Sequence, residues 1–459
     1  MNAYASRTQQ PRGLPPVWVN IFLVVQFVCI GALVVERLGS FRFGFRIMTF
    51  VSSLLMLGAM ITLPSPQMRG YPVRTIAVAY LCMLAMGFIH PELNTPLAGI
   101  AHIFLNLAII APVFWVPRFA IDAKALRRII LLIWGFYTLS ATVGVLQVYF
   151  PDRFMPDPSF VRQLVGEDVA ESLKIQLDNG QSQFRPMGLS DSPGGAGSAG
   201  LAAFVTGLAL AVTDKNILIR ALGFAGAAIG IFCVYISQVR TMLIVAGADL
   251  VVFMALTALR GKFDRAVGLL IAGVLTISLG FVWVMTIGSN AVGARLETLT
   301  DESTLTVYQQ NRGYFLTETF ERYLPEYPLG AGLGRYGMMF SYFGDRSNPF
   351  SPPIYAEIQW TAWVFDGGFP LLLLGLGGVL AAVYFAAKTA LTSNDPVLTD
   401  MATIITTLHL GVFVQTFGNI PFSGQGGLTF WLLNAALFTA SRYRRPITQR
   451  PIPMARRAW

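Results

Sequence analysis

Long apolar runs alternate with short polar connections along almost the whole chain. We expect these runs to form helices, because their lengths are close to or above the roughly 20 residues that an α-helix needs to cross a bilayer. The pattern therefore predicts an all-α polytopic membrane protein with about 12 transmembrane helices. The predicted helices cover residues 16–35, 43–63, 72–89, 96–116, 127–150, 194–213, 218–236, 239–259, 265–287, 358–386, 399–417 and 425–441.

The composition agrees with this class of protein. Hydrophobic residues make up 54% of the chain and charged residues 12%, about half the charge of an ordinary soluble domain. The 34 Phe and 8 Trp residues exclude a disordered chain. Cys29, Cys82 and Cys233 all lie inside apolar runs, so we predict neither a disulfide framework nor a zinc site.

Basic residues in the short connections predict the orientation. The connection 117–128 and the tail after residue 441 are rich in Lys and Arg, which are typical of the cytoplasmic side. Both termini are therefore expected in the cytoplasm. The predicted organisation is helices 1–5 in 1–150, an outer loop at 151–193, helices 6–9 in 194–287, a large outer loop at 288–357, helices 10–12 in 358–441 and a basic tail at 442–459.

The large loop between helices 9 and 10 is expected to be partly helical. Apolar residues recur at helical spacing from about 307 to 324, and Pro325 and Pro328 would end this helix. The cytoplasmic connections are short and contain no Walker A motif, so no nucleotide-binding domain is expected. Energy would have to come from the substrate itself or from an ion gradient.

Three arginines are expected at the outer edge of the membrane. They are Arg185, within 184–189, Arg240, between two apolar runs, and Arg312, at the start of the loop helix. A single loop arginine is more often a solvated charge, although Arg240 is costly there without an anionic partner. Together, three guanidinium groups suit a diphosphate. If a lipid diphosphate is the leaving group, these arginines would stabilise the negative charge that develops on it, so no metal or other cofactor would be required.

A glycine-rich turn follows the loop helix. Gly330, Gly332 and Gly334 alone would be typical of a flexible turn. Arg335 directly after them is a further candidate for binding the diphosphate or a glycan. Tyr314 and Tyr336 are candidates for stacking on sugar rings, although tyrosines of this kind are also typical of the aromatic belt of membrane proteins.

In order and spacing, the segments 184–189, 237–241, 311–314 and 328–334 resemble the O-antigen ligase and O-antigen polymerase superfamily over about residues 180–385. The resemblance implies a multi-pass enzyme of the bacterial inner membrane that works on the periplasmic face. It would move glycan from an undecaprenyl-diphosphate carrier to an acceptor, and Arg185, Arg240 and Arg312 would contact the diphosphate and the glycan. A chain-length regulator is a candidate partner, and no nucleic acid is expected.

One departure from the family pattern favours a polymerase over a ligase. Ligases usually carry a histidine shortly after the glycine turn, whereas His90, His102 and His409 lie elsewhere and the last two are expected to be buried. In a polymerase the acceptor is a sugar hydroxyl, whose proton needs a general base. The candidates are, in order, Glu357, then Glu318 and Glu321, then Asp366.

Each of these carboxylates also has a structural interpretation, and two other functions stay open. Glu357 could form a salt bridge with Arg335 or Arg346, and Asp366, followed by Gly367 and Gly368, could mark a break in a helix. A ligase would differ from a polymerase in its acceptor. A transporter or lipid-linked oligosaccharide flippase would use Asp249 and Asp366 on an ion path.

Overall fold

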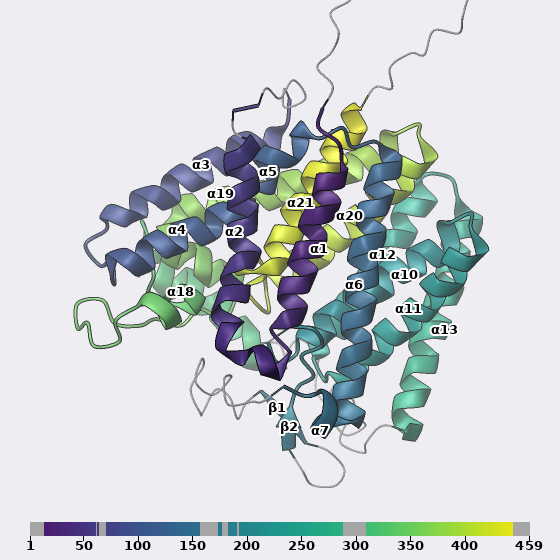
Figure 1. Cartoon of the computed structure of the whole chain (residues 1–459), viewed down its shortest axis with the longest axis horizontal. Helices are drawn as coiled ribbons and strands as arrows, with labels where there is room; N and C mark the ends of the chain where they lie inside the picture. Colours follow the sequence, from purple (N-terminus) through teal and green to yellow (C-terminus); the bar gives the residue numbers. More distant parts are fainter. Residues whose placement is uncertain are drawn as a thin grey trace, which may run out of the picture.

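The computed structural model describes residues 13–60, 62–63, 70–156, 173–176, 182–190, 192–287 and 309–443, and it consists almost entirely of helices (Figure 1). The described chain begins and ends at the same end of the bundle, whereas α7 (Pro151–Phe154) and the β1–β2 hairpin lie at the opposite end. We call this opposite end the distal end. The hairpin pairs β1 (Lys174–Gln176) with β2 (Ser182–Phe184) in antiparallel register.

Helices occupy all twelve predicted runs. They are α1 (Val17–Ala32), α2 (Arg42–Met60), α3 (Pro72–Met86), α4 (Pro96–Ile110) with α5 (Pro112–Trp115), α6 (Ala123–Tyr149), α10 (Gly195–Thr213), α11 (Ile217–Ile236), α12 (Arg240–Leu259), α13 (Phe263–Ile287), α19 (Gln359–Thr392), α20 (Pro396–Gln415) and α21 (Gln425–Arg442). In the described part of the chain, nine helices are long and apolar enough to cross a membrane, or ten if the bent pair Pro96–Ile110 and Pro112–Arg118 is one span. This confirms a polytopic membrane protein, while the count of twelve crossings stays a prediction.

Local sequence signals set several of the helix boundaries. Asp122 and Asp395 accept hydrogen bonds from backbone N–H groups in the first turns of α6 and α20, which satisfies donors that a helix start leaves unpaired. The chain bends by 43° between α4 and α5, where Pro112 can donate no backbone hydrogen bond to the preceding turn.

The central helix α10 packs against α11 through glycines. An added Cβ at Gly200 would lie 2.6 Å from the carbonyl oxygen of Gly230, and one at Gly223 would lie 2.7 Å from that of Gly207. Small residues at both faces allow the two backbones to approach closely, which is a usual way for helices to associate in membranes. This contact fixes the start of α10 at the distal end.

Helix α19 is broken inside its apolar run. Gly367 and Gly368 leave the helical conformation, and Gly368 has a φ of 63°. In hydrocarbon the backbone groups freed by such a break need internal partners. The glycine-rich turn supplies them, because Ala331 N donates to Phe365 O (2.8 Å) and Phe369 N donates to Pro328 O (3.0 Å).

The predicted loop helix is confirmed for the part of it that is described. The chain is continuously helical through η5 (Gln309–Gly313), α16 (Tyr314–Glu318), η6 (Thr319–Tyr323) and α17 (Leu324–Glu326), and Val307 lies outside the described residues. This segment packs on the first turns of α19, where the hydroxyl oxygens of Thr319 and Thr361 are 2.6 Å apart. The helix therefore covers the start of α19. The short helix α18 (Gly337–Phe343) and η7 (Pro421–Ser423) complete this side.

Candidate functional site

Two of the arginine-bearing segments meet where α10 and α12 begin. Arg185 follows β2 directly, and an added Cβ at Gly194 would lie 3.9 Å from its Cδ atom and 3.5 Å from Cγ2 of Val239. Arg240 is the first residue of α12, directly after Val239, and its side chain lies outside the described part of the structure. The backbone positions of Arg185 and Arg240 are thus brought to the same end of the bundle.

The connection between α20 and α21 links this region to the start of α19. An added Cβ at Gly418 would lie 3.5 Å from Cγ2 of Thr241. The backbone N–H of Gln359 donates to the carbonyl oxygens of Thr416 (3.1 Å) and Asn419 (3.0 Å), and its side-chain oxygen accepts from Phe422 N (3.0 Å). The starts of α12 and α19 therefore flank the same connection.

Arg312 and Glu357 form an ion pair just before α19 begins. Tyr355 also donates a hydrogen bond to Glu357 through its hydroxyl group. Both side chains remain partly exposed, 34% for Arg312 and 18% for Glu357. A salt bridge was one sequence interpretation of Glu357, with Arg335 or Arg346 as its partner. In the structure the partner of Glu357 is Arg312 instead. The first candidate base therefore contacts one of the arginines expected to bind the diphosphate.

The other predicted carboxylates lie on the loop helix. Glu318 accepts a hydrogen bond from the Tyr323 hydroxyl (3.3 Å) and lies 3.7 Å from a guanidinium nitrogen of Arg322. A hydrogen bond with Glu318 raises the pKa of Tyr314, which is exposed to solvent. Glu321 is exposed on the outer face of the same helix. The structure therefore places Glu318 in a small polar cluster with Tyr314 and leaves Glu321 outside it.

Arg335 is buried, with 4% of its side chain exposed. Its guanidinium group donates to the carbonyl oxygens of Pro352 (3.0 Å) and Ala331 (2.6 Å) and forms an ion pair with Glu92. These contacts occupy Nε and Nη1 of the guanidinium group. The placement favours a structural role over the binding role that the sequence predicted for Arg335.

The glycine-rich turn is tightly packed rather than free. Gly330, Gly332 and Gly334 all have positive φ values, of 107°, 89° and 73°. An added Cβ at Gly332 would lie 2.2 Å from the carbonyl oxygen of Glu92, and one at Gly334 would lie 2.7 Å from Cβ of Ala98. The turn thus fits between the start of α4 and the break in α19. The glycines alone would indicate a flexible turn, whereas the structure shows a closely packed one.

A buried pair of titratable side chains lies beneath this turn. His102 Nε2 is 2.9 Å from Asp366 Oδ1, and the ring of Tyr336 contacts the His102 ring edge-on. Burial raises the pKa of Tyr336 well above its ordinary value, and the charge of Asp366 adds to this rise. The sequence correctly predicted that His102 is buried, and the break beside Asp366 agrees with the structural alternative given for that residue rather than with its role as a candidate base. The sequence gave no signal that the two residues meet.

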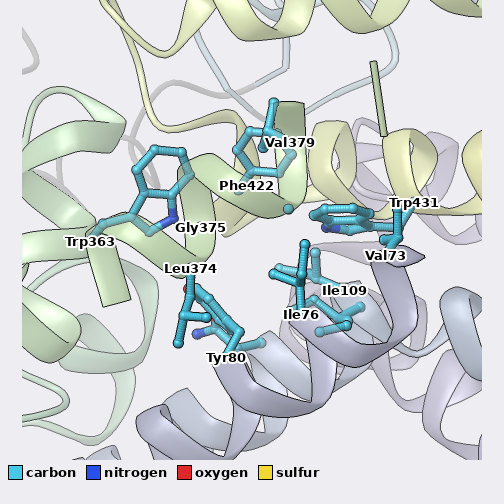
Figure 2. A pocket seen from close by; sticks show the side chains of 14 residues that line it. Val73, Ile76, Tyr80, Ile109, Trp363, Leu374, Gly375, Val379, Phe422 and Trp431 are labelled. Carbon is cyan, nitrogen blue, oxygen red and sulfur yellow. The ribbon is translucent and has the colours of Figure 1, made fainter. Parts of the chain in front are cut away.

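A small apolar cavity of about 30 Å³ lies between α3, α4, α19 and α21. Figure 2 shows the indole rings of Trp363 and Trp431 on opposite sides of it. Tyr80 lines the cavity and its hydroxyl lies 3.4 Å from Oδ1 of Asn106, whose amide donates to the His102 carbonyl oxygen. The space is large enough for one water molecule and too small for a substrate.

A much larger cavity, of about 420 Å³, enters the bundle from the distal end. It is lined by α1, α6, α10, α20 and α21, with one residue from α12. Residues of its mouth include Ser190, Gly195 and Asn419. The arginine-bearing segments adjoin residues of this mouth. An added Cβ at Gly194, directly before Gly195, would lie within 4 Å of Arg185 and Val239. The Arg312–Glu357 pair precedes Gln359, whose N–H donates to the Asn419 carbonyl oxygen.

Among the described residues, no group of three or more His, Cys, Asp or Glu side chains is arranged to hold a metal ion. No family model matches this chain, and no curated protein matches it significantly. The functional argument therefore depends on the residues at the distal end and their placement.

Proposed function

We propose that this protein is a polysaccharide polymerase that joins undecaprenyl-diphosphate-linked oligosaccharide units by inverting glycosyl transfer, without a metal. The observation that carries the proposal is the placement of three arginine-bearing segments next to residues that line one cavity: Arg185 and the start of α12 lie beside Gly194, and the Arg312–Glu357 pair precedes Gln359, which binds the Asn419 backbone. The distal end then corresponds to the periplasmic face of the bacterial inner membrane, and both termini are cytoplasmic. The product is O-antigen, capsule or exopolysaccharide.

Guanidinium groups at this depth suit a lipid diphosphate. They bind phosphate oxygens through paired, charge-assisted hydrogen bonds, and they do not lose their charge near the membrane. Arg312 is partly exposed, so an incoming diphosphate can reach it. Arg185 lies in the segment before α10 and Arg240 begins α12, and both would contact the same anion from the other side.

Diphosphate binding would also release Glu357. In the free protein Glu357 is paired with Arg312. An anion with two phosphate groups competes for this guanidinium, and the carboxylate that leaves the pair becomes free to accept a proton. Substrate binding would thus prepare the general base next to the bond that breaks.

The reaction proceeds in one displacement step. A sugar hydroxyl oxygen of one lipid-linked unit attacks the anomeric carbon of the other and forms the new glycosidic bond. The bond between that carbon and the diphosphate oxygen breaks, and the oxygen keeps the electron pair. Glu357 takes the hydroxyl proton, and the arginines stabilise the negative charge that develops on undecaprenyl diphosphate.

Transfer has to compete with hydrolysis, because water is the alternative acceptor. The loop helix 309–326 covers the start of α19 and contacts it through Thr319 and through Tyr323 on Phe365. This cover would limit the access of water to the anomeric carbon. A chain-length regulator docking at the same end would set how often the step repeats.

A carrier for lipid-linked oligosaccharide is the second candidate. Two observations favour it: the break in α19 beside Asp366, and a cavity that reaches the buried Asp249. Discontinuous helices and buried carboxylates are typical of transporters. A ligase would use the polymerase site with a different acceptor.

The proposal is tested with the lipid-linked oligosaccharide that accumulates in host cells from which this chain has been deleted. The purified protein in lipid vesicles is expected to convert this lipid into longer chains, visible as a ladder on a gel. Arg312→Ala should lower the rate at least 100-fold, because a preorganised charge that stabilises the leaving group is lost.

Arg346→Ala is the matched control, since Arg346 is an exposed arginine in the same loop. Its rate should stay close to that of the unchanged protein. Movement of the lipid across the vesicle membrane without chain growth would instead identify a carrier. Transfer to a lipid A–core acceptor in preference to a second lipid-linked unit would identify a ligase.

A further inference from the structure

The 420 Å³ cavity contains a set of polar atoms that the proposed reaction does not use. Four buried side-chain acceptors belong to its lining residues, and none of the four makes a hydrogen bond within the described part of the structure: Gln26 Oε1, Asp249 Oδ2, His409 Nδ1 and Asn419 Oδ1. A buried acceptor without a partner is unfavourable, and native structures contain few of them. Four around one cavity indicate a ligand that supplies hydrogen-bond donors.

The neighbouring contacts fix these atoms as acceptors. The amide nitrogen of Gln26 donates to Thr49 O and Ser52 Oγ (both 2.6 Å), which leaves its oxygen for another partner. His409 Nε2 lies 3.0 Å from the carbonyl oxygen of Phe430, and we therefore assign the proton of the neutral ring to that nitrogen and a lone pair to Nδ1. Gly411 leaves room for the carboxyl group of Asp249, because an added Cβ there would lie 2.6 Å from Oδ2.

The chemistry of the lining excludes some ligands and favours others. It contains no lysine or arginine among the described residues, so it does not suit a phosphate. The lining contains one carboxylate, that of Asp249, and the described residues contain no cluster of metal-ligating side chains, so the cavity does not suit a metal ion either. Most of the surface is aliphatic or aromatic, with Phe27 and Phe136 stacked at 4.2 Å. Apolar walls with a few fixed polar groups, and a volume of roughly 300–1,000 Å³, are typical of small-molecule sites.

Carbohydrate fits this combination of groups. A sugar presents several hydroxyl donors around its rim and apolar C–H faces above and below its ring. The acceptors lie at different distances from the distal end. Asp249 follows Arg240, the first residue of α12, by nine residues, or about 13 Å at 1.5 Å per residue. Asn419 lies at the mouth, next to the connection that Gln359 binds.

We infer that this cavity binds the carbohydrate of the lipid-linked unit, with Gln26, Asp249, His409 and Asn419 accepting hydrogen bonds from its hydroxyl groups. The inference rests on the function proposed above. The arginines hold the diphosphate at the mouth, and the cavity selects the sugars. Both halves of the substrate are then bound at the same time.

The test compares two probes by equilibrium binding to the full-length protein in nanodiscs. One probe is undecaprenyl diphosphate, and the other is the lipid-linked oligosaccharide that accumulates in host cells lacking this chain. The unchanged protein should bind the oligosaccharide-bearing lipid at least about tenfold more tightly, since several hydrogen bonds are added. Asp249→Ala and Asn419→Ala should each lower this preference severalfold and leave the affinity for undecaprenyl diphosphate unchanged.

Two further measurements separate binding from folding. Thr406→Val alters a buried residue of α20 that does not line the cavity, and it should keep the full preference. Asp249→Ala removes an oxygen that has no partner in the free protein, so the melting temperature should stay the same or rise. Asn419→Ala provides an independent variant, because the hydrogen bond from Gln359 N is accepted by the backbone oxygen of Asn419.

The possible results distinguish the two proposals. Equal binding of both probes by the unchanged protein would overturn the carbohydrate site and leave the diphosphate site standing. Equal losses for both probes in Asp249→Ala and Asn419→Ala would also overturn it, because these residues would then act on the whole fold. Failure to bind either probe, or no accumulation of a lipid-linked oligosaccharide, would overturn the proposed function as well.

Discussion

Nε2 of His102 lies 2.9 Å from Oδ1 of Asp366, and each side chain is about 95% buried between α4 and α19. The pair lies under the glycine-rich turn, and Asp366 directly precedes the break in α19. A charge buried in this way needs its partner, because an isolated one is costly. The contact therefore joins the N-terminal helices to the broken helix that positions Glu357.

Removing either member of this pair should destabilise the protein. We expect His102→Ala and Asp366→Ala each to lower the free energy of unfolding by about 3 kcal/mol, since each leaves a buried polar partner unpaired. The double variant should lose less than the sum of the two, because the second substitution removes the group that the first left unpaired. Thermal unfolding in detergent measures all three. Strictly additive losses would show that the two residues act independently.

The glycine turn allows a comparison between two glycines with similar backbone conformations. Gly332 and Gly337 have φ values of 89° and 68°, but only at Gly332 would an added Cβ meet a neighbour closely, at 2.2 Å from Glu92 O. Gly337→Ala should cost about 1–2 kcal/mol, the strain of a left-handed alanine. Gly332→Ala should cost more, because the backbone of Glu92 must also move. Equal melting temperatures for the two variants would contradict the tight packing of this turn.

Arg335 and Arg312 should separate stability from activity. Arg335→Ala leaves the carbonyl oxygens of Ala331 and Pro352 without their donor and Glu92 without its partner, so we expect a loss of about 3 kcal/mol in unfolding free energy. Arg312→Ala removes a partly exposed pair, and its stability should change by less than about 1 kcal/mol. Parallel melting and chain-growth measurements check this. A stable but inactive Arg335→Ala would restore the binding role that the sequence predicted.

The local parts of this structure could be predicted from the sequence. Apolar runs of sufficient length gave the twelve helices, and the spacing of Leu316 and Phe320 gave the loop helix, because both signals lie within a few turns of chain. Gly367 and Gly368 made a break in α19 one of the structural alternatives for Asp366, for the same reason. None of these predictions needed to know which helices are neighbours.

The contacts between distant segments could not be predicted in this way. Arg312 meets Glu357, Arg335 meets Glu92, and His102 meets Asp366, and in each case packing between separate elements brings the two residues together. The cavity was missed for the same reason, since its four free acceptors come from α1, α12, α20 and the connection after α20. Gln26 and Asp249 were visible as polar residues inside apolar runs, and that is the signal that could have found it.

Glu357 and Glu321 provide the last comparison, between two predicted bases in the same loop. Glu357 contacts Arg312 and Tyr355, whereas Glu321 faces solvent on the loop helix. If Glu357 accepts the hydroxyl proton, Glu357→Gln should lower the rate of chain growth by about 10²–10⁴-fold, the usual contribution of a general base. Binding of undecaprenyl diphosphate should be kept or tightened, because Arg312 no longer has a competing carboxylate. Glu321→Gln should change neither quantity. A normal rate in Glu357→Gln together with a large loss in Glu318→Gln would identify Glu318, in the cluster with Tyr314, as the general base. In that case the diphosphate would not need to break the Arg312–Glu357 ion pair to free the base.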